Sequence, residues 1–285
     1  MCGLIRLRAA RKRSRVDVSI LCVGDVVGRP GRTALRQALP DLAREHSLHC
    51  VIANVENAAG GSGLTAQLYE KFRRFGVDLM TLGDHIYRKA EVLPLLERSD
   101  RLVRPANFPR EAIGREFAVF RPASGPTVAV VSIMGRLFMK PPADCPFHAV
   151  DRVLAALPRD VKIVVVDVHA EATSEKVAMG WHLDGRVSVV FGTHTHVPTA
   201  DERVLPRGTA YISDLGMTGP HDSVLGRRTD RVTRFLMTGM PAPFDVATGD
   251  ARLNGVIVRV DADTGRAGRI ERVRVDATET EPGDD

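Results

Sequence analysis

Residues 187–197, VSVVFGTHTHV, decide the fold that we expect for this chain. The valine-rich start of this stretch lies between Arg186 and Gly192, which predicts a buried strand followed by a tight turn. His194 and His196 then stand at the carboxyl end of the strand. Because extended backbone projects alternate side chains to one side, both imidazoles are expected to reach one ligand cluster. The pattern is typical of a metal site, although two hydrogen-bonded loop histidines would give the same spacing.

Strand and helix patterns alternate outward from this stretch. Short apolar runs predict strands at 17–24, 50–53, 77–82, 118–121, 127–133, 161–168 and 209–213, with the run at 118–121 antiparallel or at an edge. Helical spacing predicts helices at 32–45, 65–75, 89–98, 149–157 and 172–180, the second of them capped by Thr65. Runs at 255–260 and 270–275, joined by a turn-rich segment, predict an antiparallel hairpin. The expected class is therefore α/β, with a largely parallel central β-sheet flanked by helices and a closing antiparallel hairpin at the C-terminus.

The length and composition favour one ordinary globular domain. The chain has 285 residues, 44% hydrophobic and 26% charged. We find no internal repeat and no linker, so we expect a basic N-terminal extension at 1–16, a single domain at 17–275 and a polar tail at 276–285. No apolar run approaches the roughly 20 residues that a membrane span needs.

The positive charge is concentrated at one end of the chain. Residues 1–16 hold six Arg and Lys and no acid, against a net charge of +5, so the rest of the chain is close to neutral. This arm is either a dispensable extension or a segment that contacts RNA or a membrane surface. Cys2, Cys22, Cys50 and Cys145 are scattered without CxxC spacing, which indicates buried thiols and a cytoplasmic location.

Polar side chains follow five of the predicted strands at the points where the strands end. In parallel sheets these ends meet at one edge, where ligands bind. Several buried carboxylates at one edge need a cation, and mixed oxygen and imidazole donors suit Mn, Fe, Zn or Co. Their number exceeds one coordination shell, which favours two metals about 3.5–4 Å apart. The residues are Asp25, Glu56, Asn57, Asp84, His85, His169, His194 and His196.

The same residues lie in segments that resemble a known family. The order of Gly-Asp, Glu-Asn, Gly-x-His, His and Gly-x-His-x-His motifs is similar to that of the calcineurin-like metallophosphoesterases. The residues in and around these motifs resemble those of the YmdB-type 2′,3′-cyclic-nucleotide 2′-phosphodiesterases over about residues 20–275. The segments are GDVVGRPGR (24–32), ENAAGGSGLT (56–65), LVRPANFP (102–109), DVHAEATSEK (167–176), GTHTHV (192–197) and AYISDLGMTGP (210–220).

This resemblance implies a metallophosphoesterase-like layered fold, two divalent metal ions and a homo-oligomer. Iron or manganese is expected, with zinc as an alternative. A hydroxide between the ions would attack a 2′,3′-cyclic nucleotide, and His85 would donate a proton as the 3′-nucleotide forms. The ligands implied for one ion are Asp25, Asn57 and His196, those for the other are Asp84, His169 and His194, and Glu56 is shared.

One position departs from the family pattern. The family has Asn where this chain has Asp84, between Gly83 and His85. Three carboxylates and a hydroxide would balance the charge of two divalent ions, whereas Asn would leave one positive charge. A less positive site attracts a phosphate diester less strongly and acidifies water less. We therefore expect altered activity or metal preference.

Two other readings of the sequence remain open. Gly24, Gly28 and Gly31 follow the first strand and could form a phosphate-cradling loop, although Asp25 would repel a phosphate without a metal. Alternatively, the chain is a weakly active regulatory or RNA-associated binding protein that retains the fold. Arg104 is a candidate phosphate contact, with an ordinary surface arginine as the alternative.

Overall fold

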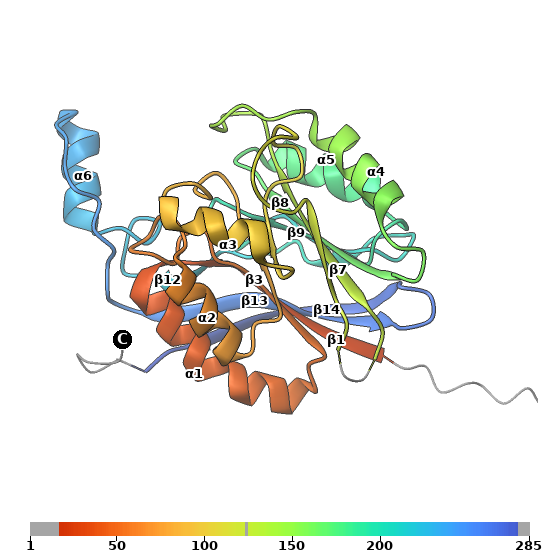
Figure 1. Cartoon of the computed structure of the whole chain (residues 1–285). Helices are drawn as coiled ribbons and strands as arrows, with labels where there is room; N and C mark the ends of the chain where they lie inside the picture. The colour runs from red at the N-terminus through yellow and green to blue at the C-terminus, as the bar shows by residue number, and fades with distance from the viewer. Residues whose placement is uncertain (1–16, 123–124, 279–285) are drawn as a thin grey trace, which may run out of the picture.

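The computed structural model describes residues 17–122 and 125–278. Two β-sheets pack face to face, and helices cover the outer face of each (Figure 1). The basic extension at 1–16 and residues 279–285 of the expected polar tail lie outside the described residues. The α/β class, the largely parallel strands and the C-terminal antiparallel hairpin are confirmed.

The first sheet has eight strands in the order β2-β12-β13-β1-β3-β4-β5, with β14 paired to β13. Strands β1, β3, β4 and β5 are parallel, so their carboxyl ends lie at one edge of the sheet. β13 runs antiparallel to β1 and forms the closing hairpin with β14. The bounds are β1 Asp17–Val23, β2 Asp25–Val26, β3 Cys50–Asn54, β4 Leu79–Thr81, β5 Leu102–Val103, β12 Met217–Pro220, β13 Ala251–Asp261 and β14 Ala267–Asp276.

The second sheet has six strands in the order β10-β11-β9-β8-β7-β6. Strands β7, β8, β9 and β11 are parallel. The run predicted to be antiparallel or at an edge forms β6, which is both antiparallel and at the edge of the sheet. The bounds are β6 Phe117–Phe120, β7 Val128–Met134, β8 Ile163–His169, β9 Val189–Thr193, β10 Arg203–Val204 and β11 Ala210–Ile212.

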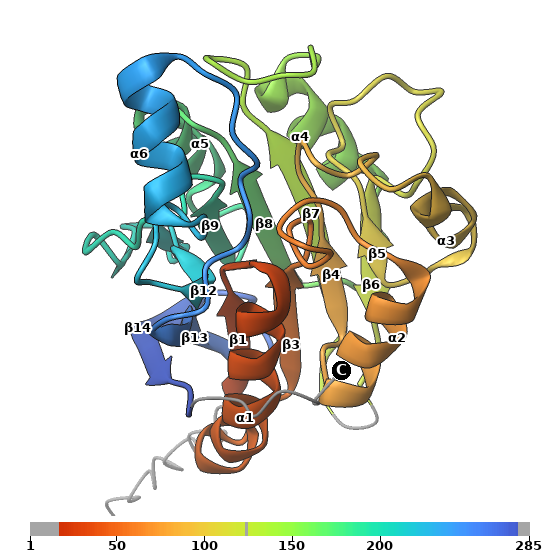
Figure 2. The ribbon, with the colours of Figure 1, turned by 90° about the vertical axis from the view of Figure 1, so that its left-hand side faces the viewer.

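The helices divide between the two outer faces. Helices α1 (Gly28–His46), α2 (Ala66–Phe75) and α3 (Leu93–Arg98, after a short 3₁₀ turn at Ala90–Val92) cover the first sheet. Helices α4 (Pro146–Ala156) and α5 (Thr173–Leu183) cover the second sheet. Helix α6 (Thr229–Thr238) buries only Val232 and stands off the body (Figure 1), and Figure 2 shows the chain after it running past the first turn of α1.

The apolar core accordingly forms three layers. Alternate residues of each strand face opposite sides, so Ile20 and Cys22 of β1 face the second sheet while Leu21 and Val23 face the helices. Between the sheets these side chains meet Val165 of β8 and other residues of the second sheet. Both strands are buried on both faces, which explains why they read as continuous apolar runs.

Local predictions hold best where a side chain fixes the end of an element. Thr65 caps α2 by accepting a hydrogen bond from the Leu68 amide at 3.2 Å, and the helix ends at Phe75 as predicted. Helix α1 begins at Gly28, four residues earlier than predicted, because Pro30 is compatible with a first helical turn. Apolar runs do not say which sheet a strand joins, so the division into two sheets was not predicted.

Two simpler expectations concern the membrane and the cysteines. Within the described ranges, no helix combines the length and the apolar character that a bilayer span requires. Cys22 and Cys50 are buried free thiols, as expected, and Cys145 is a partly buried free thiol. Burial raises the pKa of the Cys22 thiol well above its usual range, and such buried thiols are unreactive.

Candidate metal centre

The residues expected at the site come from the carboxyl ends of strands in both sheets. Asp25 begins β2, directly after β1, while Glu56 and Asn57 follow β3 and Asp84 and His85 follow β4. From the second sheet, His169 ends β8, and His194 and His196 follow β9. All eight side chains are joined by contacts with one another, so they converge as expected. They converge between two sheets, whereas the sequence predicted the edge of one sheet.

Four of these side chains form one compact group. Potential ligand atoms of Glu56, Asp84, His169 and His194 all lie within 4.8 Å of one another. The Nε2 atom of His169 lies 3.0 Å from Asp84 Oδ1 and 3.3 Å from Glu56 Oε1. His194 Nδ1 lies 3.1 Å from His169 Nε2 and 3.4 Å from Asp84 Oδ1. This spacing leaves the four groups able to share one cation.

A second group lies on the other side of Glu56. His196 Nε2 is 3.8 Å from Asp25 Oδ1 and 3.3 Å from Asn57 Nδ2. Asn57 Nδ2 also donates to Glu56 Oε1 at 3.2 Å, so the Glu56 carboxylate touches both groups. Asp25 is fully buried, yet its Oδ1 atom has no hydrogen-bond partner among the described residues. A buried carboxylate oxygen without a partner is costly unless something else, such as a cation, binds it.

His85 lies between the two groups and the solvent. Its Nδ1 atom is 2.6 Å from Asn57 Oδ1, and its backbone amide donates to Glu56 Oε2 at 3.0 Å. Its Nε2 atom is 3.7 Å from Asp84 Oδ2. The His85 side chain is 27% exposed, whereas that of Glu56 is 1% exposed. The imidazole is therefore held by the cluster and is still open to the cavity.

The backbone of the His194 and His196 segment differs from the prediction. Strand β9 ends at Thr193, and His194 and His196 have φ angles of 91° and 65°, so the expected extended backbone is wrong. Positive φ is strained for residues with a Cβ atom, and side-chain hydrogen bonds hold this turn: Asp25 Oδ2 accepts from the His194 amide at 3.1 Å. The two imidazoles contact different groups, which is the division that the family resemblance implied.

A buried ion pair supports the same turn from behind. Lys176 of α5 donates to Asp214 Oδ2 at 2.6 Å, and both side chains are buried. Asp214 also accepts from the Thr195 hydroxyl at 2.7 Å and from the Gly216 amide at 2.8 Å. Sequence reasoning did not single out Lys176 or Asp214, although both lie in segments that carry the family resemblance.

A hydrogen-bonded chain orients His169. The Thr193 hydroxyl donates to Asp167 Oδ1 at 2.6 Å, so it accepts from His169 Nδ1, 2.8 Å away. Asp167 also accepts from Thr81 at 2.5 Å and from Asn54 at 3.1 Å, both on the first sheet. With its proton on Nδ1, His169 presents Nε2 to the cluster. Asp167 was missed from sequence, although its spacing of two before His169 on one strand places both on the same face.

The electrostatics of the cluster require positive charge. Burial acts to lower the pKa of His169, but the carboxylates of Glu56 and Asp84 outweigh burial and raise it well above its ordinary value. Burial acts to raise the pKa of Glu56 and Asp84, but His169 outweighs burial and lowers both. Burial raises the pKa of Asp25, with His196 opposing it. Without a cation, the negative charge of the carboxylates favours a proton on the buried His169 imidazole.

These residues fit divalent cations. Carboxylate, amide and imidazole donors without thiolate suit borderline and hard divalent metals. Among the described residues the Asp25 Oδ1 atom has no hydrogen-bond partner, so one group has an unused buried oxygen donor. The raised pKa of His169 shows that the other group favours a positive charge. Gly83 leaves space for the ligand ring, because a Cβ atom there would lie 2.2 Å from the His169 imidazole.

A cavity of about 450 Å³ opens onto the two groups. Its volume is within the range of small-molecule sites. Val197 and Leu225, about half exposed, form apolar parts of its wall, and Arg227 supplies a positive charge. The cavity residues outside the eight expected ones are Gly61, Glu171, Thr195, Val197, Leu225 and Arg227.

Arg104 does not belong to this cavity. Its side chain is 3% exposed and donates to the carbonyl oxygens of Pro105, Ala112 and Gly114 at 2.8–3.1 Å. It also pairs with Glu116 at 3.3 Å. Neither the phosphate contact nor the surface arginine expected from sequence is found, because the Arg104 guanidinium instead binds the loop that follows β5.

Comparison with known proteins agrees with this geometry. Over 256 residues the chain is 44% identical to the 2′,3′-cyclic-nucleotide 2′-phosphodiesterase of Bacillus subtilis, covering 90% of this chain and 96% of the relative. It is 35% identical to a putative phosphatase/phosphodiesterase of Mycoplasma pneumoniae, covering 91% and 93%.

Solved structures with the same fold include two bacterial proteins. A hypothetical protein from Thermus thermophilus has a TM-score of 0.85 and 42% identity, covering 92% of this chain and all of that one. A novel phosphatase from Mycoplasma pneumoniae has a TM-score of 0.87 and 32% identity, covering 93% and 96%. The family model described as YmdB-like protein matches residues 21–273. The resemblance inferred from the motifs is thus confirmed, and the chain belongs to the YmdB-like family.

Proposed function

We propose that this protein is a metal-dependent phosphodiesterase that hydrolyses 2′,3′-cyclic nucleotides to 3′-nucleotides. The observation that carries the proposal is the pair of donor groups that share Glu56 beside an open cavity. The name of the Bacillus subtilis relative supports the substrate class. The phosphatase title of the Mycoplasma pneumoniae structure supports phosphoester hydrolysis more generally.

Two cations would divide the donors as the contacts do. Asp25, Asn57 and His196 would hold one, and the group around His169 would hold the other, with Glu56 shared. When bound, such ions polarise phosphoryl oxygens and lower the pKa of a coordinated water. Oxygen and imidazole donors favour iron or manganese as the native pair, and zinc is the alternative.

We assign proton donation to His85. Its imidazole borders the cavity and contacts Asn57 and Asp84, which fix the direction of the ring. In the proposed reaction a water adds to phosphorus, the bond from phosphorus to the ribose 2′-oxygen breaks, and His85 gives its proton to that oxygen. The products are a 2′-hydroxyl and a 3′-phosphate.

The cavity also provides for the rest of the nucleotide. Val197 and Leu225 offer exposed apolar side chains on which a base can pack. The positive charge of Arg227 attracts the phosphate end, and its guanidinium is held by the carbonyl oxygens of Gly60 and Phe244 at 3.3 and 2.9 Å. The cavity therefore has an apolar wall and a positively charged end, which match the base and the phosphate of a mononucleotide.

The test is hydrolysis of 2′,3′-cyclic AMP by protein that is first stripped of metal and then reloaded with iron, manganese or zinc. We expect no turnover in the stripped protein, recovery after reloading with about two ions per chain, and 3′-AMP as the product. Turnover by the stripped protein, or 2′-AMP as the product, would contradict the proposal.

A second function is favoured by one observation. His169 and His194 hold the pKa of Asp84 low against the effect of burial, so this carboxylate stays charged where the family has a neutral amide. The extra negative charge weakens the attraction for a phosphodiester, which suits a regulatory or RNA-associated protein with a weakly active site. Turnover near that of an Asp84→Asn variant would exclude this reading.

The remaining proposals concern the cellular location, the oligomeric state and the RNA contact of the protein. We propose a cytoplasmic homo-oligomer, with any RNA contact through the basic residues at 1–16. Removal of residues 1–16 tests the RNA contact, because binding through them would weaken steeply with added salt and would disappear with the deletion.

A further inference from the structure

Glu171 lines the cavity that opens onto the two donor groups (the catalytic cavity), although it is not one of the eight expected site residues. It lies in the turn between β8 and α5, two residues after His169. The Gly135 amide donates to the His169 carbonyl oxygen at 2.9 Å, and Ala170 is fully buried, so this turn is fixed at the end of the second sheet. The fold therefore sets the position of Glu171 beside the donor groups.

The Glu171 carboxylate lies one imidazole ring away from the donor atoms of the cluster. Its Oε2 atom is 3.4 Å from His194 Nε2. The other nitrogen of that ring, Nδ1, is 3.4 Å from Asp84 Oδ1 and 3.1 Å from His169 Nε2. Glu171 thus contacts the outer side of a ring whose inner side faces the cluster, and Coulomb interactions extend over this separation.

The charge of Glu171 is not neutralised by a neighbouring base. Its side chain is 51% exposed, and among the described residues no Lys or Arg forms an ion pair with it. Arg227, the base in the lining of the same cavity, instead donates to the carbonyl oxygens of Gly60 and Phe244. Glu171 therefore adds negative charge to the catalytic cavity.

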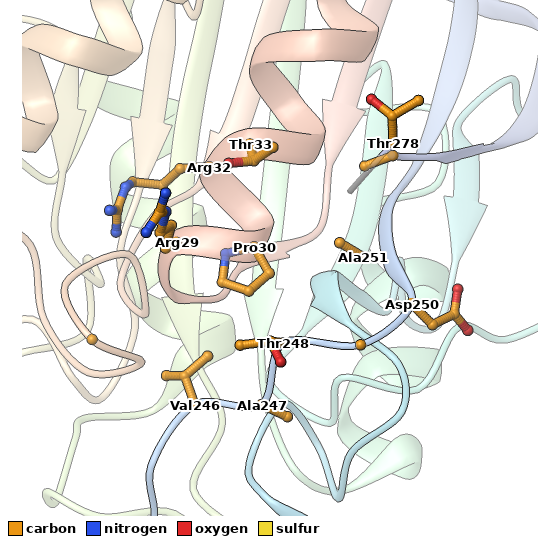
Figure 3. A pocket seen from close by; sticks show the side chains of 13 residues that line it. Arg29, Pro30, Arg32, Thr33, Val246, Ala247, Thr248, Asp250, Ala251 and Thr278 are labelled. Atoms are coloured by element: carbon orange, nitrogen blue, oxygen red, sulfur yellow. The ribbon is translucent and has the colours of Figure 1, made fainter. Parts of the chain in front are cut away.

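The acid of a second cavity is paired differently. This cavity, of about 780 Å³, lies between the first turn of α1 and residues 246–251 (Figure 3), and none of the eight expected site residues lines it. Its acid, Asp250, accepts hydrogen bonds from Arg252 with both carboxylate oxygens, one of them at 2.7 Å. The charge of Asp250 is thus balanced by a base, whereas the charge of Glu171 acts on whatever enters the catalytic cavity.

The charge of the ligand changes during the proposed reaction. A phosphodiester carries one negative charge, and a phosphomonoester, whose second pKa is about 6, carries nearly two at neutral pH. Asp25, Glu56 and Asp84 already balance most of the charge that two divalent cations would bring, and Glu171 adds to them. Because each charge on the ligand is repelled, Glu171 repels a dianion about twice as strongly as a monoanion.

We propose that Glu171 is a specificity-determining residue, whose carboxylate selects phosphodiesters over phosphomonoesters and favours release of the monoester product. This inference rests on the proposed function and deepens it, because it explains how one site distinguishes a 2′,3′-cyclic nucleotide from the 3′-nucleotide that it becomes. The carboxylate acts by its charge, across the ring of His194.

The test replaces Glu171 by Gln. The amide has the size of the carboxylate and can still accept a hydrogen bond from His194 Nε2, so Glu171→Gln removes the charge and leaves the ring held. Glu45→Gln is the matched control. Glu45 is an exposed acid of α1 whose Oε1 atom lies 3.8 Å from His46 Nε2, and it lines neither cavity.

The probes are 3′-AMP, which is a dianion at pH 7.5, and its methyl ester, which is a monoanion. Titration calorimetry on the metal-loaded full chain measures the binding of each, and elemental analysis measures the metal content of each variant. These probes report affinity whether or not the protein turns over.

We expect Glu171→Gln to bind the methyl ester about fivefold and 3′-AMP about 25-fold more tightly than the native protein, because one repulsion is removed for each charge on the ligand. The preference for the monoanion should therefore fall about fivefold. At 1 M salt, where the screening length is about 3 Å, the gain should shrink to within about twofold for both probes. Glu45→Gln should bind both probes as the native protein does, and metal content should be the same in all three proteins.

An equal gain for the two probes, the absence of a gain, or a gain that persists at 1 M salt would overturn the inference. Loss of metal in Glu171→Gln would also overturn it, because the carboxylate would then act by holding His194. Failure of the proposed function is distinct, because it appears as a lack of turnover of 2′,3′-cyclic AMP while the binding of both probes can still be measured.

Discussion

The two sheets contribute opposite chemistry to the site. The first sheet supplies the carboxylates, namely Asp25, Glu56 and Asp84, together with Asn57 and His85. The second supplies His169, His194 and His196. The carboxylates by themselves would repel one another, and the imidazoles by themselves would bind a cation without neutralising it. A balanced donor set exists only where the two sheets meet.

The two sides also differ in how their side chains are held. On the imidazole side, Thr193 and Asp167 orient His169, and Asp214 holds the turn of His194 and His196. On the carboxylate side, Asp25 has a buried oxygen without a hydrogen-bond partner among the described residues. The imidazole side is thus organised in advance, while the carboxylate side depends on the cations.

The largest effect is expected for Glu56→Gln, which keeps the size of the side chain that both groups share and removes its charge. Both ions should be lost and kcat/KM for 2′,3′-cyclic AMP should fall below detection, a greater loss than for any change that leaves the metals bound. Elemental analysis and turnover measure this. Retention of both ions would show that the carboxylate side does not depend on charge as proposed.

His85→Ala is expected to lower kcat about 10²–10⁴-fold, the usual contribution of a general acid. Metal content should stay near two ions, because the surrounding donors remain. His182→Ala is the matched control, since His182 of α5 pairs with Asp151 of α4 and does not line the catalytic cavity. If metal and rate fell together in His85→Ala, His85 would be a ligand and not the proton donor.

Asp167→Asn should weaken metal binding about 10–100-fold, as is usual when the partner that orients a ligating histidine is changed. The amide offers one acceptor oxygen where the carboxylate offers two, so the chain through Thr193 to His169 is disturbed. Competition with a chelator gives the affinity. Unchanged affinity would mean that packing alone orients His169.

Metal loading should depend on pH through His169. Its pKa in the metal-free fold is raised above 6.5, so below the raised value a cation must displace a proton, and apparent affinity falls about tenfold per pH unit. The same group stabilises the metal-free protein fully below pH 6.5 and loses that contribution as pH rises through the raised pKa. Thermal melts of metal-free and loaded protein between pH 6 and 9 should diverge as pH rises, and parallel curves would refute the linkage.

The smallest effect is expected for Asp84→Asn, which restores the amide of the family pattern. Turnover should rise by a few-fold and the ranking of manganese, iron and zinc should change, because one negative charge leaves the second group. The substitution also changes a carboxylate whose Oδ1 atom contacts both His169 and His194, and this disturbance reduces the expected gain in turnover. An unchanged metal profile would show that the charge at this position is compensated elsewhere.

The sequence by itself determined the donors and the ends of the strands. A strand that ends in Asp, Glu, Asn or His can be predicted from its own residues, because its apolar periodicity lies within one short segment of the sequence. The cap at Thr65 and the hairpin of β13 and β14 could be predicted for the same reason.

Only the tertiary structure decided how those ends combine. It divided the strands into two sheets, gave His194 and His196 positive φ angles, buried Arg104 away from the site, and placed Asp167 and Asp214 behind the ligands. Each of these depends on contacts between residues far apart in the chain. The packing of one sheet against the other sets such contacts, and no local pattern encodes that packing.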